Sequence, residues 1–211
     1  MQIQNTNLNF SSRNATIRKA DDLARKINKE FPRISDSLIQ DYKHAKEFDA
    51  LLIRLRNKRR QVRNCKMGRF NNAPTYIKKI LALIEPVKKE RFGNCAESAQ
   101  IAAIAAKING IENATVASLR TPSGDRFDHA VLLVRDKNPY VIDPWLGFAD
   151  YVPNAFEKYR GEYRHHFDFS DKYTDRMTLV ASEDDVSWFL RKNTKHTDIK
   201  DLKKRIPNLL V

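Results

Sequence analysis

The sequence is poor in cysteine and has neither a long apolar run nor the pattern of a secretory signal. Its 211 residues include two cysteines, Cys65 and Cys95, too few for a disulfide framework, and this indicates a reducing compartment. No apolar stretch approaches the length of a membrane span, and no basic start is followed by a short apolar core. With 41% apolar residues, the chain can bury one substantial core. We therefore expect residues 13–211 to form one compact unit.

Charged side chains are absent from residues 1–12, which are rich in Asn, Gln, Ser and Thr. This composition is typical of a frayed terminus. It also resembles the N-termini of bacterial type III secretion effectors, so the alternative prediction is an unfolded leader that serves as an export signal.

Residues 13–90 are predicted to be helical. A first helix begins near Ser11 or Ser12 and ends near Pro32, and a second begins at Ser35. A third helix follows the break at residues 71–74, and Pro86 is expected to kink or end it.

Positive charge is concentrated in this helical part. Residues 1–90 contain 21 Lys and Arg against 9 Asp and Glu, whereas residues 91–211 contain 18 against 17. An acid-free run lies within the second helix and comprises Arg54, Arg56, Lys58, Arg59, Arg60, Arg63, Lys66 and Arg69. Within it, Arg56, Arg59, Arg60 and Arg63 form a predicted basic patch for a phosphate backbone, anionic lipid or an acidic protein surface. The alternative is a solvated helix face, and the lack of interleaved aromatic residues argues against base stacking.

Cys95 is predicted to lie at the start of a helix. Asn94 is a favoured N-cap residue, and Glu97 lies three positions later, close to a capping-box spacing. Apolar residues then recur at helical spacing until Asn109-Gly110. In the first turn, backbone N–H groups and the helix dipole favour the reactive thiolate of Cys95, although Glu97 acts in the opposite direction. The alternative role for Cys95 is that of a small buried apolar residue.

Two predicted strands, residues 128–134 and 139–143, bring a histidine and an aspartate into the same region. If their hairpin is symmetric about Asp136, His129 lies directly opposite Asp143, and Leu133 opposite Pro139. Directly opposed side chains share a face, with Cβ atoms about 4.5–5.5 Å apart. Asp143 can then orient the imidazole and leave its second nitrogen for Cys95. Separately, His129 can be a core histidine and Asp143 a turn former, but the order Cys, His, Asp favours a nucleophilic thiol enzyme.

Further elements complete a predicted α+β fold, in which the helix that carries the nucleophile packs on a small antiparallel sheet. Residues 113–120 and 176–181 are expected to be strands, and residues 184–192 and 198–205 closing helices. The turn at residues 121–125 is a predicted substrate-facing loop. Residues 91–211 form the expected catalytic core. Arg164-His165-His166 lacks a Cys or carboxylate at ligand spacing, so we expect neither a metal nor a cofactor.

Gly93-Asn94-Cys95, His129-Ala130 and Ile142-Asp143-Pro144-Trp145 resemble the motifs of transglutaminase-like and papain-like cysteine enzymes. The resemblance is nearest to bacterial toxin and effector glutamine deamidases, and it covers about residues 91–147. It implies that Cys95 is the nucleophile, His129 the general base and acid, and Asp143 the orienting residue. Asn94 and Trp145 are the candidate substrate or oxyanion contacts. The chain departs from transglutaminases at Ala96, and its 34-residue separation of Cys95 and His129 is shorter than in papain-type proteases.

The predicted activity is attack on an amide through a thioester, most simply the deamidation or transglutamination of glutamine in a host-cell protein. A cysteine protease is the first alternative. A non-catalytic basic module that binds nucleic acid or anionic membrane is the second. By its resemblance to effectors, the protein is expected to be made in a bacterial cytoplasm and secreted into the host cell.

Overall fold

The computed structural model describes residues 10–31, 48–120, 126–162, 178–181, 190 and 195–211. Most of its helices precede the sheet along the chain. They are α1 (Phe10–Glu30), α2 (Phe48–Asn72), α3 (Tyr76–Glu90) and α4 (Cys95–Ile108). Helix α5 (Val152–Arg160) follows the fourth strand, and α7 (His196–Arg205) with the short 3₁₀ turn η4 (Pro207–Leu209) ends the described chain.

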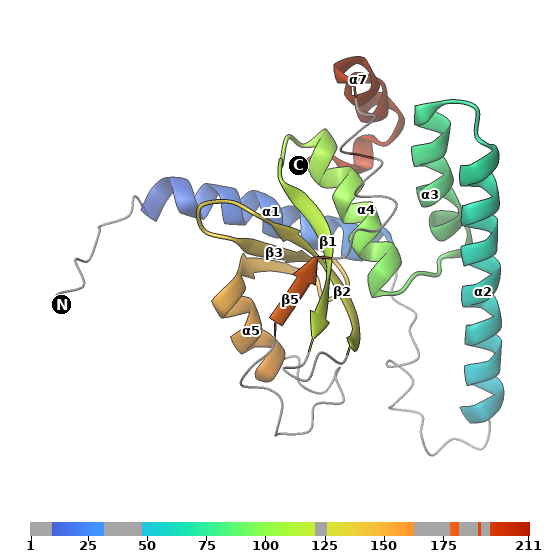
Figure 1. Ribbon diagram of the computed structural model, residues 1–211, viewed down its shortest axis with the longest axis horizontal. Coiled ribbons are helices and arrows are strands. Elements are labelled where there is room, and N and C mark those ends of the chain that lie inside the picture. Colours follow the sequence, from blue (N-terminus) through green and yellow to red (C-terminus); the bar gives the residue numbers. More distant parts are fainter. Residues whose placement is uncertain (1–9, 32–47, 121–125, 163–177, 182–189, 191–194) are drawn as a thin grey trace.

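Five antiparallel strands form one sheet in the order β4-β3-β2-β1-β5 (Figure 1). The strands are β1 (Ala114–Arg120), β2 (Arg126–Val134), β3 (Tyr140–Asp143), β4 (Phe148–Tyr151) and β5 (Thr178–Ala181). The α+β prediction is confirmed at this level, including a helix beginning at Cys95 that packs on the sheet. Strand β4 and helix α5 were not predicted.

Helices cover both faces of the sheet, because side chains alternate between faces along each strand. The even-numbered face packs with α1, α3 and α4, and contributes Val116, Leu132, Val134, Tyr140 and Ile142 to a large buried cluster. The odd-numbered face packs against α5 and contributes Ala117, Leu119, Val131, Leu133 and Val141 to a second cluster. In Figure 1, α5 accordingly lies on the opposite side of the sheet from α4.

Helix α1 packs on the even-numbered face through a regular apolar stripe. Ala20, Leu23, Ala24 and Ile27 are all fully buried, and their spacing of three and four residues places them on one side of the helix. This stripe fixes α1 against β3 and β4, which brings its polar residues close to the turn between those strands.

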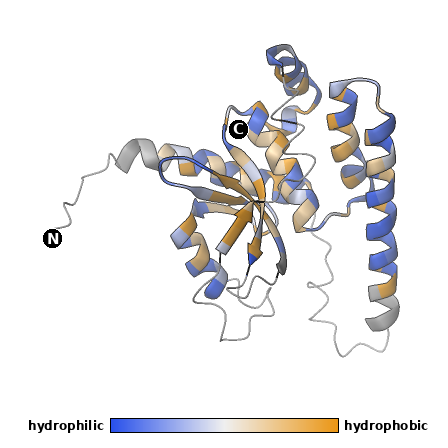
Figure 2. Ribbon diagram, in the orientation of Figure 1, coloured by the Kyte–Doolittle hydropathy of each residue, from blue (hydrophilic) through white to orange (hydrophobic). Residues whose placement is uncertain are grey.

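Helices α2 and α3 lie side by side (Figure 1), and α2 is largely hydrophilic along its length (Figure 2). Helix α3 carries the buried apolar residues Ile80, Leu83, Ile84 and Val87, whereas α2 contributes Val62 to the core. Among the described helices, none combines the length and the apolar composition needed to cross a membrane.

The predicted register of the β2–β3 hairpin is wrong by two residues. Leu133 pairs with Val141 rather than Pro139, and Val134 pairs with Tyr140. Proline cannot donate to a strand ladder, so β3 begins after Pro139 and the connecting loop is centred on Lys137 instead of Asp136. Continuing this register places Asp143 beside Val131, diagonal to His129. Because the shift is even, His129 and Asp143 remain on the same face.

Pro86 does not end α3, which continues to Glu90. The helix stops where Arg91 adopts the left-handed conformation with φ of 49°. Pro86 and Val87 are both buried, so packing holds the last turn although the proline lacks a backbone donor. Helix α1 begins at Phe10 and ends at Glu30, close to its predicted limits.

Several sequence predictions lie outside the described residues. They are the Ser35 cap, the loop at residues 121–125, the segment Arg164-His165-His166, and most of the closing helix predicted at residues 184–192. The second predicted closing helix is α7, which begins two residues earlier than expected.

Candidate functional site

The start of α4 holds Cys95 in the first helical turn. The Oδ1 atom of Asn94 accepts hydrogen bonds from the backbone N–H groups of Ala96 (3.1 Å) and Glu97 (3.3 Å). In return, Glu97 Oε2 accepts a hydrogen bond from the Asn94 backbone at 3.3 Å, which completes the predicted capping box. Cys95 is the first residue of the helix and is 7% exposed.

Cys95 belongs to a different buried cluster from the other buried apolar residues of α4. The apolar residues of α4 from Ala99 to Ile108 pack in the even-face cluster, whereas Cys95 packs in the odd-face cluster with Trp145 and Tyr159. His129 and Asp143 have odd numbers in their strands, so the same face holds all three residue types of the predicted triad.

His129 and Asp143 are in direct contact. His129 Nε2 lies 2.6 Å from Asp143 Oδ2, and both side chains are almost completely buried. A diagonal pair of cross-strand residues is farther apart than a directly opposed pair, but an imidazole is long enough to close that gap. The predicted contact is therefore confirmed, although the residues meet by a different register.

Cys95 is the second group that acts on the imidazole, since a hydrogen bond and a charge interaction with it are among the causes that raise the pKa of His129. Since Nε2 is engaged by Asp143, the nitrogen that remains for the sulfur is Nδ1. Burial alone would lower the pKa of His129, but the charge and hydrogen bond of Asp143 outweigh it, and Cys95 adds to them. Together they raise the pKa of His129 from 6.5 to about 10. The imidazole is consequently protonated at neutral pH.

Tyr159 is a member of the site that sequence reasoning missed. Its hydroxyl donates a 3.0 Å hydrogen bond to Asp143 Oδ2, and the backbone N–H of Leu146 donates to Oδ1 at the same distance. The carboxylate is thus fixed by three donors from β2, α5 and the turn after β3. The spacing of Val152, Ala155, Phe156 and Tyr159 is that of an apolar helix face, and it was the available signal for α5.

Helix α1 holds the turn that follows Asp143. Asn28 Nδ2 donates to the carbonyl oxygens of Pro144 and Trp145, each at 2.9 Å. Gly147 closes the turn with φ of 78°, and a Cβ at this position would lie 3.3 Å from Asn28 Cγ. This close approach lets Asn28 fix the backbone on which Asp143 and Trp145 stand.

Aromatic rings surround the imidazole. The rings of Trp145 and Tyr159 have centroids 5.5 Å and 5.9 Å from that of His129. Trp145 is buried beside the triad, and Asn94 lies next to Cys95 with its side-chain oxygen committed to the helix cap. Their predicted roles as substrate or oxyanion contacts stay predictions.

Lys66 of α2 reaches the first two turns of α4. Its Nζ lies 3.1 Å from Glu97 Oε1 and donates to Gln100 Oε1 at 2.7 Å, with only 5% of the lysine side chain exposed. Lys66 therefore differs from the rest of the acid-free run, because it is a buried partner of the capping residue Glu97. A run of cations in the sequence does not indicate which member faces inward.

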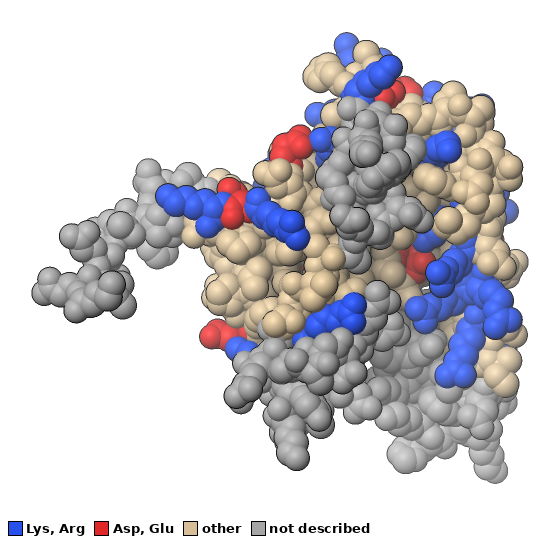
Figure 3. Space-filling view, in the orientation of Figure 1, with Lys and Arg blue, Asp and Glu red and all other residues tan. Residues whose placement is uncertain are grey.

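The predicted basic patch lies on α2 beside this contact. Arg56, Arg60 and Arg63 are exposed and Arg59 is half-buried. Lys58 and Arg69 pair with Glu90 and Glu85 on α3, whereas none of the four arginines has an ion pair within the described chain. Lys and Arg side chains gather over this part of α2 in Figure 3.

Within the portion of the chain that the structure describes, no three His, Cys, Asp or Glu side chains come together as a metal-binding group. No protein-family model matches the chain, and no curated protein matches it. The family resemblance accordingly rests on the motifs around Cys95, His129 and Asp143 alone.

Proposed function

We propose that this protein is a thiol-dependent enzyme that attacks amides, with Cys95 as nucleophile, His129 as general base and acid, and Asp143 as the orienting residue. The observation that carries the proposal is the buried 2.6 Å contact between His129 and Asp143 on an imidazole that also hydrogen-bonds Cys95. A buried ion pair is costly to desolvate and is weak evidence of a stabilising role. Strongly perturbed titratable groups are instead concentrated at functional sites.

The reaction begins with attack of the Cys95 thiolate on the amide carbon. The thiolate is the nucleophilic form of a cysteine. As the tetrahedral intermediate collapses, the C–N bond breaks and His129 gives its proton to the departing amine or ammonia. The resulting thioester is then attacked by water or by a second amine, whose proton returns to His129, and the C–S bond breaks to release the acid or the new amide and restore the Cys95 thiolate. Asp143 keeps the imidazole in the orientation that serves both transfers.

The substrate class proposed is a glutamine side chain in a host protein, which makes the protein a deamidase when water accepts the acyl group and a transglutaminase when an amine does. This assignment is supported by the likeness of the motifs at residues 93–95, 129–130 and 142–145 to effector deamidases. The same likeness supports a papain/transglutaminase-like core and secretion from a bacterium into the host cell. The oxyanion would form beside the backbone N–H of Cys95, with Asn94 or Trp145 as the second predicted contact.

Mass spectrometry of a host-cell lysate treated with the purified protein tests this function. Deamidation, cross-linking and cleavage leave different mass signatures, so one experiment separates the three reactions. Cys95→Ser should abolish the change, and His129→Ala should do nearly as much. Asp143→Asn should lower the rate by orders of magnitude, about 10⁴ by analogy with serine proteases, because it permits the wrong imidazole tautomer.

The matched control is Cys65→Ser, which removes the other free thiol at an exposed position on α2. This variant should retain full activity. The triad effects should also fail to add, so that Cys95→Ser with His129→Ala is scarcely worse than Cys95→Ser alone. A lysate modified equally by wild type and Cys95→Ser would refute the enzyme. If binding to nucleic acid or anionic vesicles then persisted in Cys95→Ser, the alternative of a non-catalytic basic module would replace it.

A further inference from the structure

Three of the four arginines of the basic patch form a stripe along α2 that begins next to Lys66, which contacts α4. Arg56, Arg59 and Arg63 precede Lys66 by ten, seven and three residues. At about 100° per residue, they lie within about 80° of the direction in which Lys66 points. Arg60 lies farther round the helix, toward solvent. At about 1.5 Å per residue, the stripe extends about 15 Å from Lys66 along the helix axis.

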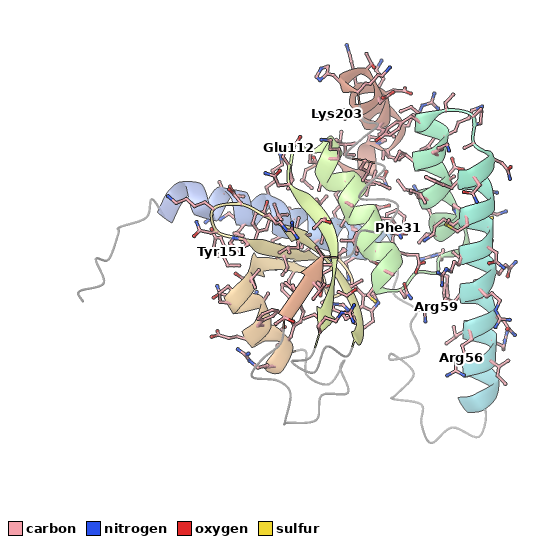
Figure 4. The ribbon with its side chains drawn as sticks, viewed as in Figure 1. Phe31, Arg56, Arg59, Glu112, Tyr151 and Lys203 are labelled. Atoms are coloured by element: carbon pink, nitrogen blue, oxygen red, sulfur yellow. The ribbon has the colours of Figure 1, made fainter. Side chains whose placement is uncertain are left out.

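Lys66 fixes the position of this stripe relative to Cys95. Its contacts with Glu97 and Gln100 join α2 to the first two turns of α4, two residues beyond the nucleophile. The stripe therefore begins beside the predicted active site and runs away from it. Figure 4 places Arg59 near the level of the start of α4 and Arg56 farther along α2.

The exposed side chains near the stripe indicate which class of anionic partner it fits. Ile53 and Met67, two of the exposed large apolar residues, lie on the same side of α2 as Arg56 and Arg60 and are 57% and 37% exposed. Isolated apolar residues contribute nothing to a phosphate backbone, which is held by cations and polar groups. Two of them are also too few for the apolar face of a membrane-surface helix. Arginine together with methionine and apolar residues is instead typical of protein interfaces.

We infer that Arg56, Arg59, Arg60 and Arg63 form a docking surface for an acidic segment of the protein whose amide Cys95 attacks. This inference rests on the proposed function for the identity of the docked protein. Charge complementarity carries it, because the arginines have no acidic partner among the described residues. Docking along α2 would deliver an amide that neighbours the acidic segment to the start of α4.

Fluorescence anisotropy of labelled peptides with full-length Cys95→Ala protein tests the surface without catalysis. One peptide contains a glutamine flanked by a run of glutamates, and the second has serine in place of each glutamate. The test variant is Arg56→Gln/Arg59→Gln/Arg63→Gln. The matched control is Lys200→Gln/Lys203→Gln/Lys204→Gln on α7, where all three lysines are exposed and the change in net charge is the same. Figure 4 shows Lys203 at the top of the view and Arg56 at the lower right, well apart from each other.

The protein should bind the glutamate peptide more tightly than the serine peptide, and added salt should weaken the difference. The arginine variant should lose about tenfold in affinity for the glutamate peptide, since each exposed ion pair is worth about twofold to fivefold. The α7 control should be within about twofold of the parent protein. Replacing the same three arginines with lysine keeps the charge and should preserve most of the binding, which separates a docking defect from a folding defect.

Equal losses in the arginine variant and the α7 control would overturn the inference, because net charge alone would explain them. Tighter stripe-dependent binding of duplex DNA or phosphatidylserine vesicles than of the glutamate peptide would also overturn it. A separate turnover assay on the glutamate peptide, with Cys95 intact, distinguishes the two proposals. Stripe-dependent binding without turnover of any amide would support the docking surface and refute the enzyme.

Discussion

Replacing Lys66 with methionine should destabilise the protein far more than the same change at Lys58. Both lysines lie on α2 and pair with a glutamate, but in different surroundings. Lys66 and Glu97 are 3.1 Å apart with side chains 5% and 11% exposed, whereas Lys58 and Glu90 are 3.9 Å apart and 42% and 34% exposed. Methionine preserves the length of the apolar stem while it removes the charge.

The expected loss of unfolding free energy depends on whether the glutamate that remains is buried or exposed. Removing one partner of a buried ion pair typically costs about 3–5 kcal/mol, because the remaining charge is buried without compensation. Glu97 keeps the hydrogen bond from the Asn94 backbone, so we expect a value near the lower end, about 3 kcal/mol. For Lys58→Met we expect about 1 kcal/mol or less, as for other exposed pairs. Urea denaturation should show a midpoint shift of about 1 M or more for Lys66→Met.

A double-mutant cycle isolates the ion pair. Glu97→Gln keeps an oxygen for the capping box but removes the negative charge. Combined with Lys66→Met, it leaves no unpaired buried charge, so the double variant should be more stable than Lys66→Met alone. Lys66→Met should also slow alkylation of Cys95, because the charge of Glu97 then stands unneutralised two residues away. Equal destabilisation by Lys66→Met and Lys58→Met would refute the role assigned to this contact.

Three further outcomes are expected. Cys95 should react with iodoacetamide at neutral pH faster than Cys65, although Cys65 is exposed and Cys95 is buried. Peptide mass spectrometry measures both rates, and faster alkylation of Cys65 would count against an activated thiol at Cys95. The raised pKa of His129 should stabilise the fold fully below pH 6.5, and this contribution should be lost as the pH rises through about 10. Urea titrations across that range should therefore show a decline in wild type that is absent from His129→Gln. Tyr159→Phe should cost about 1.5–3 kcal/mol in unfolding free energy, because it removes a hydrogen bond to a buried carboxylate, and an unchanged midpoint would contradict that.

The grouping of the three candidate residues could be predicted because their signals are local. Asn94 and Glu97 define the helix start by their spacing alone, and the capping box is formed by backbone and side-chain atoms within one turn. His129 and Asp143 likewise stay on the same face of the sheet when the predicted register is wrong by an even number of residues. Type and spacing therefore sufficed to bring Cys95, His129 and Asp143 to one place.

The supporting residues could not be predicted because their partners are distant in the chain. Asn28 contacts the turn 116 residues later, and Lys66 contacts Glu97 across 31 residues. Nothing in the surrounding sequence of either residue indicates these contacts. The register of the hairpin depends on the residue at which β3 begins. Pro139 has no backbone N–H for the strand ladder and so lies before β3, but the sequence alone does not show where the loop ends.

The division of the molecule into two buried clusters accounts for the position of the candidate site. A helix packed on one face of a sheet ordinarily keeps its side chains on that face, but the first residue of α4 belongs to the cluster on the other face. The beginning of β2 and the end of β3 meet there because the strands are antiparallel, and this brings His129 and Asp143 to the same end of the sheet. Three helices then supply one polar side chain each: Asn28 from α1 to the turn, Lys66 from α2 to the helix start, and Tyr159 from α5 to the carboxylate. A buried thiol, imidazole and carboxylate contribute little to stability that apolar residues would not, so the support that three helices give them is what the proposed chemistry at Cys95 would require.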